Sequence, residues 1–146
     1  SGALIRMQDM GVERYLITSS VNGVLSQRLV RTLCVHCKEP VMPSADVLAS
    51  SGLGRFLKPG VPMYRARGCA HCRDTGDLGR TGIHELLVID DVMRKAILEG
   101  KDATVLHANA VRAGMLTLYE DGLRKVASGT TCLEELLRVT QEDRDA

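Results

Sequence analysis

The sequence is poor in aromatic residues: it has no tryptophan, one phenylalanine and three tyrosines among 146 residues. Hydrophobic residues of all kinds still make up 45% of the chain, which is enough for a core built from Leu, Val, Ile, Met and Ala. The length suits one compact domain or two small ones. The shortage of aromatic rings also argues against a surface on which nucleic-acid bases stack.

Neither sign of charge dominates, since 19 basic residues stand against 18 acidic ones and the formal net charge is +1. Such a balance creates no electrostatic field that would attract nucleic acid or an anionic membrane surface. Long hydrophobic runs are also missing, because none approaches the roughly 20 residues needed to span a bilayer. The first residues lack the charged-then-apolar pattern of a secretion signal. These absences predict a cytoplasmic protein that neither binds nucleic acid nor inserts into a membrane.

The motifs of common catalytic and nucleotide-binding sites are absent. The sequence contains no G-x-x-x-x-G-K-[ST] phosphate loop and no G-x-G-x-x-G fingerprint after a strand. The glycine-rich stretch GDLGRTG at 76–82 has neither the lysine nor the following helix of a phosphate loop, so its glycines are predicted to form turns. No nucleophile–base pair and no pair of carboxylates can be argued. The sequence therefore predicts no catalytic residue and no bound nucleotide in this chain itself.

Cysteines are the residues that stand out. The sequence has five, an odd number that leaves one over from any complete set of internal disulfides. In a chain without a secretion signal, paired C-x-x-C motifs indicate metal binding or redox chemistry. The leftover residue, Cys132, is predicted to be a small core residue on a helix. The other four form the pattern C-x2-C-x31-C-x2-C, at Cys34, Cys37, Cys69 and Cys72.

A structural zinc ion is the favoured interpretation of this pattern. Two residues between a pair of thiolates allow a tight turn to aim both sulfurs at one ion, at about 2.3 Å. Four thiolates complete a tetrahedron with no open position, which is typical of structural rather than catalytic zinc. Lys38 and Arg73 directly follow the two motifs and can offset the negative charge. The alternatives are a thioredoxin-like redox pair, which lacks the βαβ context such pairs have, and cysteines that are unliganded or disulfide-bonded.

Histidines occupy the same position in both motifs, at His36 and His71. Four cysteines already fill a tetrahedron, and a residue inside such a turn points away from the ion. Both histidines are therefore predicted to lie outside the set of metal ligands. His84 and His107 stand alone, in an expected strand and an expected helix, and are interpreted as ordinary packing or surface residues.

Capping signals predict several helices. A helix over 3–10 is expected to end at Gly11, and another is expected between Ser44 as its N-cap and Gly52 as its stop. The other helices are expected to begin after acidic caps or after T-x-x-E capping boxes, at Asp90 or Asp91, Asp102, Thr117 and Thr131.

Strand signals are weaker. Short strands are predicted within 61–68 and 80–89, on either side of the glycine-rich stretch. The stretch 23–33 fits helical spacing but also has the β-branched content of a strand, so periodicity alone leaves both readings open.

Four stretches resemble the C-terminal region of a known family, the ATPases that drive type II protein secretion and type IV pilus assembly. The resemblance covers essentially the whole chain apart from the spacer at 41–62, and it leans towards secretion rather than pilus assembly. The stretches are GALIRMQDMGVE, SQRLVRTLCVHCKEP, GCAHCRDTGDLGRTGIHELL and GMLTLYEDGLRKVASGTTCLEELLRVTQED.

The resemblance implies an α+β fold in three segments. Residues 1–33 would be the last elements of a RecA-like motor core, 34–89 a tetracysteine zinc module with short strands and a helix, and 90–146 a helical C-terminal subdomain. The stretch 23–33 would then be a strand of the motor core. The zinc ligands would be the matching cysteines, Cys34, Cys37, Cys69 and Cys72.

The resemblance also implies a setting for the chain. Members of this family are hexameric ATPases whose Walker A and B motifs lie upstream of the region seen here. ATP and Mg²⁺ would therefore bind only in a longer parent protein, and this chain alone would be inactive. Its partners would be neighbouring subunits of the hexamer and proteins of the inner-membrane secretion platform. Its place would be the cytoplasmic side of the bacterial inner membrane, to which partners would hold it.

Two hypotheses from other classes stay open at this point. A free-standing zinc-ribbon module that binds nucleic acid is disfavoured by the balanced charge and the few aromatic residues. An oxidoreductase that uses either C-x-x-C pair is disfavoured because no βαβ unit surrounds the motifs.

Overall fold

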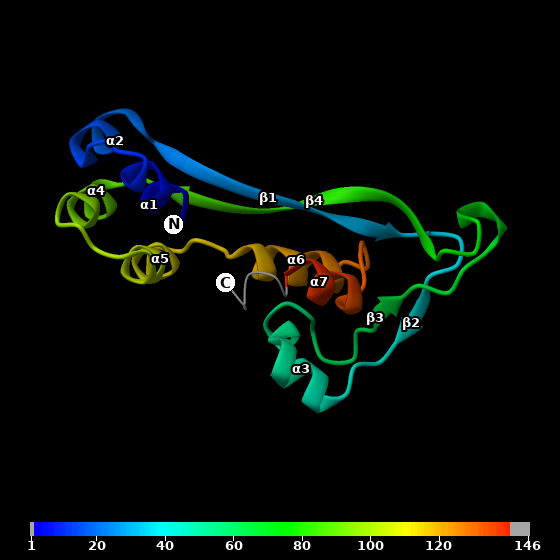
Figure 1. The fold of residues 1–146 in the computed structure, drawn as a ribbon. Coiled ribbons are helices and arrows are strands. Elements are labelled where there is room, and N and C mark those ends of the chain that lie inside the picture. The colour runs from blue at the N-terminus through cyan, green and yellow to red at the C-terminus, as the bar shows by residue number, and fades with distance from the viewer. Residues whose placement is uncertain (1, 141–146) are drawn as a thin grey trace. The chain divides into compact units, whose positions relative to one another are not determined.

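The computed structural model describes residues 2–140 and contains both helices and strands, so the expected mixture of α and β structure is confirmed (Figure 1). Its α-helices are α1 Gly2–Asp9, α2 Arg14–Ser20, α3 Ala45–Ser51, α4 Asp91–Leu98, α5 Ala103–Arg112, α6 Leu118–Ala127 and α7 Leu133–Thr140. Its 3-10 helices are η1 Leu53–Arg55 and η2 Ala70–Cys72. Its strands are β1 Gly23–Leu33, β2 Glu39–Val41, β3 Met63–Arg65 and β4 Asp77–Val88. Within residues 2–140, every helix is too short or too polar to cross a membrane.

The described residues divide into two compact units, each assembled from two separate stretches of chain. Residues 2–26 and 85–117 form the first unit, and residues 27–84 and 118–140 form the second. Strands β1 and β4 pair as a two-stranded sheet, and each contributes residues to both units. The three predicted segments, a motor core, a zinc module and a helical subdomain, were defined by their expected roles, and that division stays a prediction.

The first unit has a helical core. Helix α1 ends as predicted at Gly11, whose φ of 88° is a conformation that glycine adopts at little cost. The Val12 N–H donates to the Met7 carbonyl at 3.0 Å, which satisfies a carbonyl at the end of the helix. The buried residues come from α1, α2, α4, α5 and the end of β4: Leu4, Ile17, Leu87, Ile89, Met93, Ala96, Ile97, Leu106 and Ala110.

Side-chain caps begin three helices where the sequence predicts them. Ser44 caps α3, Asp90 caps α4 and Asp102 caps α5. In each case the side-chain oxygen accepts a hydrogen bond from the backbone N–H three residues further on, which satisfies a donor that the helix leaves free. Gly52 ends α3 in the left-handed conformation, also as predicted.

Helix α2 is not predicted from the sequence. Its N-cap residue, Glu13, makes no side-chain capping bond, and the β-branched Ile17 and Thr18 favour helix only weakly. Tertiary packing supplies the missing signal, because Ile17 is fully buried in the core of the first unit. A seven-residue helix with two adjacent buried residues, Ile17 and Thr18, has no helical periodicity from which the sequence could predict it.

The two long strands bring one confirmation and one correction. Strand β1 confirms the strand that the family resemblance implies for 23–33. The prediction that the glycines of 76–82 form turns holds for Gly76, which precedes β4, but is wrong for Gly79 and Gly82, which lie inside β4. Pairing with β1 keeps the chain extended there, and the φ of 82° at Gly79 is an irregularity that glycine tolerates within a strand.

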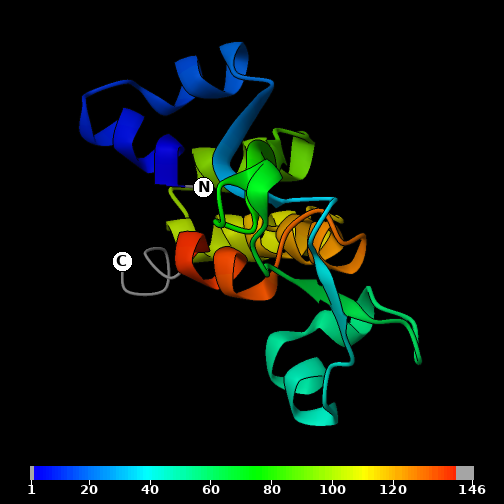
Figure 2. The ribbon, with the colours of Figure 1, turned by 90° about the vertical axis from the view of Figure 1, so that its right-hand side faces the viewer.

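The second unit has its own apolar core, in which α6 and α7 pack together. Figures 1 and 2 both show α7 lying alongside α6. A Cβ atom at Gly122 would lie 2.1 Å from Leu136 Cδ1, so the close approach of the two helices depends on glycine. The buried residues come from these helices, from β1 and β4 and from the segment after α3: Val30, Leu53, Leu57, Ile83, Leu123, Val126, Leu133 and Leu136.

A buried carboxylate ties α7 to β1. The side chain of Glu135 is 1% exposed, and it accepts hydrogen bonds from the Arg31 backbone N–H at 3.0 Å, the Arg31 guanidinium at 2.7 Å and the Arg138 guanidinium at 2.8 Å. Burial alone would raise the pKa of Glu135, but hydrogen bonds from Arg138 and Arg31 outweigh it and lower that pKa to about 2. Arg31 also pairs with Asp77, the first residue of β4, at 3.1 Å. The guanidinium of Arg31 in β1 thus contacts both α7, through Glu135, and β4, through Asp77.

We expect Glu135→Gln to lower the free energy of unfolding by about 2 kcal/mol at pH 7, because a buried acceptor of charged hydrogen bonds loses its charge. The pKa of Glu135 is about 2 when folded, against an ordinary value of 4.5. Its ionisation therefore stabilises the fold fully above about pH 4.5, and that contribution is lost as the pH falls towards 2. Urea denaturation should show that the difference in free energy of unfolding between Glu135→Gln and the wild type narrows as the pH falls from about 4.5 towards 2.

The matched control is Glu134→Gln, which removes the charge of an exposed neighbouring carboxylate. The free energy of unfolding of this variant should lie within about 0.5 kcal/mol of the wild-type value. Equal stabilities for the two glutamine variants would contradict the assignment of Glu135 as the carboxylate that holds α7 to β1.

Candidate metal centre

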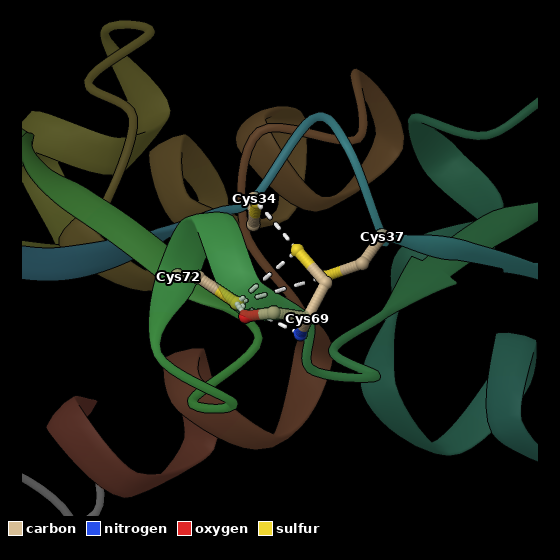
Figure 3. A group of neighbouring side chains, drawn as sticks. All are labelled: Cys34, Cys37, Cys69 and Cys72. Atoms are coloured by element: carbon tan, nitrogen blue, oxygen red, sulfur yellow. Dashed lines mark hydrogen bonds between the residues drawn. The ribbon is translucent and has the colours of Figure 1, made fainter.

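Two tight turns carry the cysteines of the C-x2-C motifs. The first cysteine turn, Cys34–Cys37, directly follows β1, and the second cysteine turn, Cys69–Cys72, contains η2. Both close in the same way, since the Cys37 N–H donates to the Cys34 carbonyl at 3.2 Å and the Cys72 N–H donates to the Cys69 carbonyl at 3.1 Å. Figure 3 shows the side chains of both turns pointing to a common centre.

The sulfur atoms of this four-cysteine cluster lie within 4.8 Å of one another. The Sγ atoms of Cys34 and Cys69 are 3.9 Å apart, those of Cys37 and Cys72 are 3.8 Å apart, and those of Cys69 and Cys72 are 3.8 Å apart. A tetrahedron with metal–sulfur bonds of about 2.3 Å has edges of about 3.8 Å. The cluster therefore matches the donor type and the spacing of a tetrahedral thiolate site.

A small β ladder brings the two cysteine turns together across the 31-residue spacer. Strands β2 and β3 pair antiparallel, with Glu39 opposite Arg65 and Val41 opposite Met63. The Glu39 carboxylate also accepts contacts from Arg65 at 3.0 Å and from Arg67 at 3.3 Å. Because β2 begins shortly after the first turn and β3 ends shortly before the second, the register of the ladder sets how the two turns face each other.

Backbone N–H groups surround one of the sulfurs. The N–H groups of Cys69 and Gly76 each donate to Cys72 Sγ at 3.2 Å. Burial alone would raise the pKa of the Cys72 thiol, but these donors outweigh it and lower that pKa to about 6. Burial and the neighbouring sulfurs raise the pKa of Cys37 to about 12. Such crowded sulfurs do not all ionise unless a cation sits among them.

Left-handed backbone follows the second cysteine turn. Arg73 and Asp74 have φ angles of 55° and 60°, although neither is glycine. The Asp74 N–H donates to the Cys69 carbonyl at 2.9 Å, so the chain curls back over the turn. A Cβ at Gly68 would lie 2.7 Å from the Asp74 carbonyl oxygen, so glycine is required on the facing segment. This strain is not visible in the sequence, because arginine carries no signal for positive φ.

The histidines of the two turns face each other. The rings of His36 and His71 are stacked, with centroids 4.2 Å apart and planes inclined by 23°. Both residues are exposed, and neither belongs to the four-cysteine cluster. The prediction that they lie outside the ligand set stays a prediction. Their contact was not foreseen, because it follows from how the turns face each other.

The remaining sequence candidates lie apart from the cluster. His84 lies in β4, where its backbone N–H donates to Asp121 Oδ2 at 3.0 Å, and His107 is half-buried in α5. Cys132 is buried as predicted, but it lies just before α7 rather than on the helix, and burial raises the pKa of its thiol. Burial of this kind is typical of a packing cysteine rather than a reactive one.

Comparison with known proteins matches the family described as "Type II/IV secretion system protein" to residues 1–138. The chain belongs to this family. It is 49% identical over 140 residues to the type IV pilus assembly ATPase PilB of Thermus thermophilus, which covers 96% of this chain and 16% of that protein. It is 47% identical over 143 residues to the type II secretion system ATPase E of Vibrio cholerae, covering 97% of this chain and 27% of that protein.

A third relative, the type II secretion system protein E of Dickeya dadantii, is 44% identical over 142 residues, which cover 97% of this chain and 28% of that protein. The chain thus spans about a sixth to just over a quarter of the length of these relatives. Secretion and pilus ATPases match at similar identity, so the chain represents a region that the two kinds of ATPase share.

We expect Arg73→Gly to raise the free energy of unfolding by about 1 kcal/mol, because glycine removes the cost of a left-handed arginine. Arg80→Gly is the matched control: Arg80 is also an exposed arginine, but its φ is not positive. That variant should lower stability by about 0.5–1 kcal/mol, since glycine weakens a strand. Urea denaturation of both variants measures the difference. A loss of stability in Arg73→Gly would show that the left-handed backbone at Arg73 is not strained.

Proposed function

We propose that this chain is the zinc-binding C-terminal part of a motor ATPase of the type II secretion and type IV pilus family. The observation that carries the proposal is the placement of Cys34, Cys37, Cys69 and Cys72, whose sulfurs have the spacing of a tetrahedral thiolate site. Membership of the family supports the wider setting.

The proposed role of the metal is structural. Four thiolates leave no position for water or substrate, so a bound zinc ion would act as a crosslink rather than a Lewis acid. It would join the first cysteine turn to the second across a spacer that is otherwise held by a three-residue ladder, one capped helix and the buried side chains of Leu53 and Leu57. Binding of the ion would then supply part of the folding free energy of the second unit.

The activity of the whole motor is proposed for a longer parent. The chain matches at most 28% of the length of the relatives named above. ATP and Mg²⁺ would bind outside this region, and residues 1–33 would complete a RecA-like motor core. Residues 34–89 and 90–146 would form the zinc module and the helical subdomain. Neighbouring subunits of a hexamer and inner-membrane proteins of the machine would be the partners, with the motor on the cytoplasmic face of the inner membrane.

We expect freshly purified, reduced protein to contain about one zinc ion per chain, and chelation to lower the melting temperature, because the ion holds the two turns together. Cys34→Ser and Cys69→Ser should each lose the ion, since each removes one of four thiolates. Cys132→Ser is the matched control, because it removes a cysteine outside the cluster and should keep the ion. Elemental analysis gives the metal content.

Well under one zinc ion per chain in the wild type would overturn the proposal. Equal metal loss in all three serine variants would show that the four-cysteine cluster is not the site. A disulfide reductase activity that depends on Cys34 or Cys69 would favour redox chemistry instead, and salt-dependent binding of DNA or RNA would favour a nucleic-acid module.

A further inference from the structure

The residues on both sides of the first cysteine turn donate hydrogen bonds to one segment, residues 128–132 between α6 and α7, called the α6–α7 turn below. Leu33, which precedes Cys34, donates its N–H to the Thr130 carbonyl at 2.9 Å. Lys38, which follows Cys37, donates from Nζ to the Gly129 carbonyl at 2.8 Å. Two successive carbonyls of the α6–α7 turn therefore hold the two residues that flank one pair of sulfurs.

Lys38 meets a second group in the same place. Its Nζ lies 4.5 Å from the centroid of the Tyr64 ring, within the range of a cation–π contact. Tyr64 belongs to β3 and faces Pro40 of β2 in the ladder that follows the first cysteine turn. The lysine thus joins the cysteine turn, the ladder and the α6–α7 turn at one point.

The α6–α7 turn fits closely against this point. Gly129 has a φ of 67°, and a Cβ there would lie 2.6 Å from Tyr64 Cδ2 and 3.2 Å from Lys38 Nζ. The turn is anchored on its other side as well, since the Thr131 hydroxyl donates to the Arg31 carbonyl at 2.7 Å. A positive charge is well placed here, because the turn follows the C-terminus of α6, where the last carbonyls of the helix carry partial negative charge.

We infer that Lys38 couples metal occupancy of the four-cysteine cluster to the position of the α6–α7 turn. The inference rests on the proposed zinc binding. The turn holds Lys38 and Leu33 so that Cys34 and Cys37 face the second cysteine turn, and Lys38 is thus a positioning residue for the metal. Linkage is reciprocal, so the metal stabilises the α6–α7 turn by the same factor by which the turn stabilises the metal. A partner that displaces the turn would loosen the ion.

The test compares zinc release from Lys38→Met with release from the wild type, using a chromogenic chelator in excess. Loss of a half-buried charged hydrogen bond should speed release about tenfold. Arg55→Met is the matched control: it removes a basic side chain that contacts α6 through Glu120 and lies near the Phe56 ring, away from the cysteine turns. This control should release zinc at the wild-type rate.

Amide hydrogen exchange supplies a readout that general destabilisation does not move. In the wild type, removing zinc should speed exchange at the amides of the α6–α7 turn, which donate to carbonyls in the last turn of α6: Gly129, Thr130 and Thr131. In Lys38→Met this response to zinc should shrink several-fold. Tyr64→Leu removes only the aromatic ring that Lys38 contacts, and it should release zinc at a rate between those of the wild type and Lys38→Met. This variant replaces Lys38→Met in the test if Lys38→Met folds poorly.

The outcomes separate the two claims. A wild type that holds no zinc overturns the proposed function and the coupling with it. A wild type that holds zinc, with Lys38→Met releasing it no faster than Arg55→Met, overturns the coupling alone. Zinc-dependent exchange at the α6–α7 turn that persists unchanged in Lys38→Met also overturns it. Faster release together with a lost exchange response establishes it.

Discussion

The constraint on which the second unit depends is that four thiol sulfurs meet within 4.8 Å. Such a cluster of ionisable groups does not assemble by hydrophobic packing, and its thiolates repel unless a cation lies among them. The surrounding elements bring the four sulfurs together. Strand β1 leads into the first cysteine turn, the β2–β3 ladder pairs the two ends of the spacer, and the second cysteine turn leads into β4. Strained residues such as Arg73 persist because the turn they complete is held from several sides.

A second polar centre, around Glu135, stands beside the apolar core. Its carboxylate links α7 to β1 through Arg31, and the Arg31 carbonyl in turn accepts from Thr131 in the α6–α7 turn. That turn also holds Leu33 and Lys38 on either side of the first cysteine turn. The helical pair α6–α7 and the four-cysteine cluster are therefore parts of one hydrogen-bonded network.

Local signals explain why much of the fold could be predicted. Ser44, Asp90 and Asp102 cap helices because a short polar side chain can reach an N–H three residues on, which depends on few neighbours. The cysteine spacing could be interpreted because a C-x2-C turn, like a helix cap, depends on residues close together in the sequence. Helix α2 and the course of the chain through Gly79 could not, since Ile17 is held by the core of the first unit and Gly79 by pairing with β1.

By itself, the sequence determined the caps of α3, α4 and α5, the four cysteines as one candidate site and the family to which the chain belongs, because these depend on residue type and short spacing. The capping box predicted at Thr131 was wrong, since its hydroxyl donates to the Arg31 carbonyl instead. Only the tertiary structure decided which groups surround that site. The stack of His36 on His71 and the bond from Lys38 to Gly129 join residues 35 and 91 positions apart. Contacts at such separations follow from strand register and helix packing, for which no local pattern of residues is a guide.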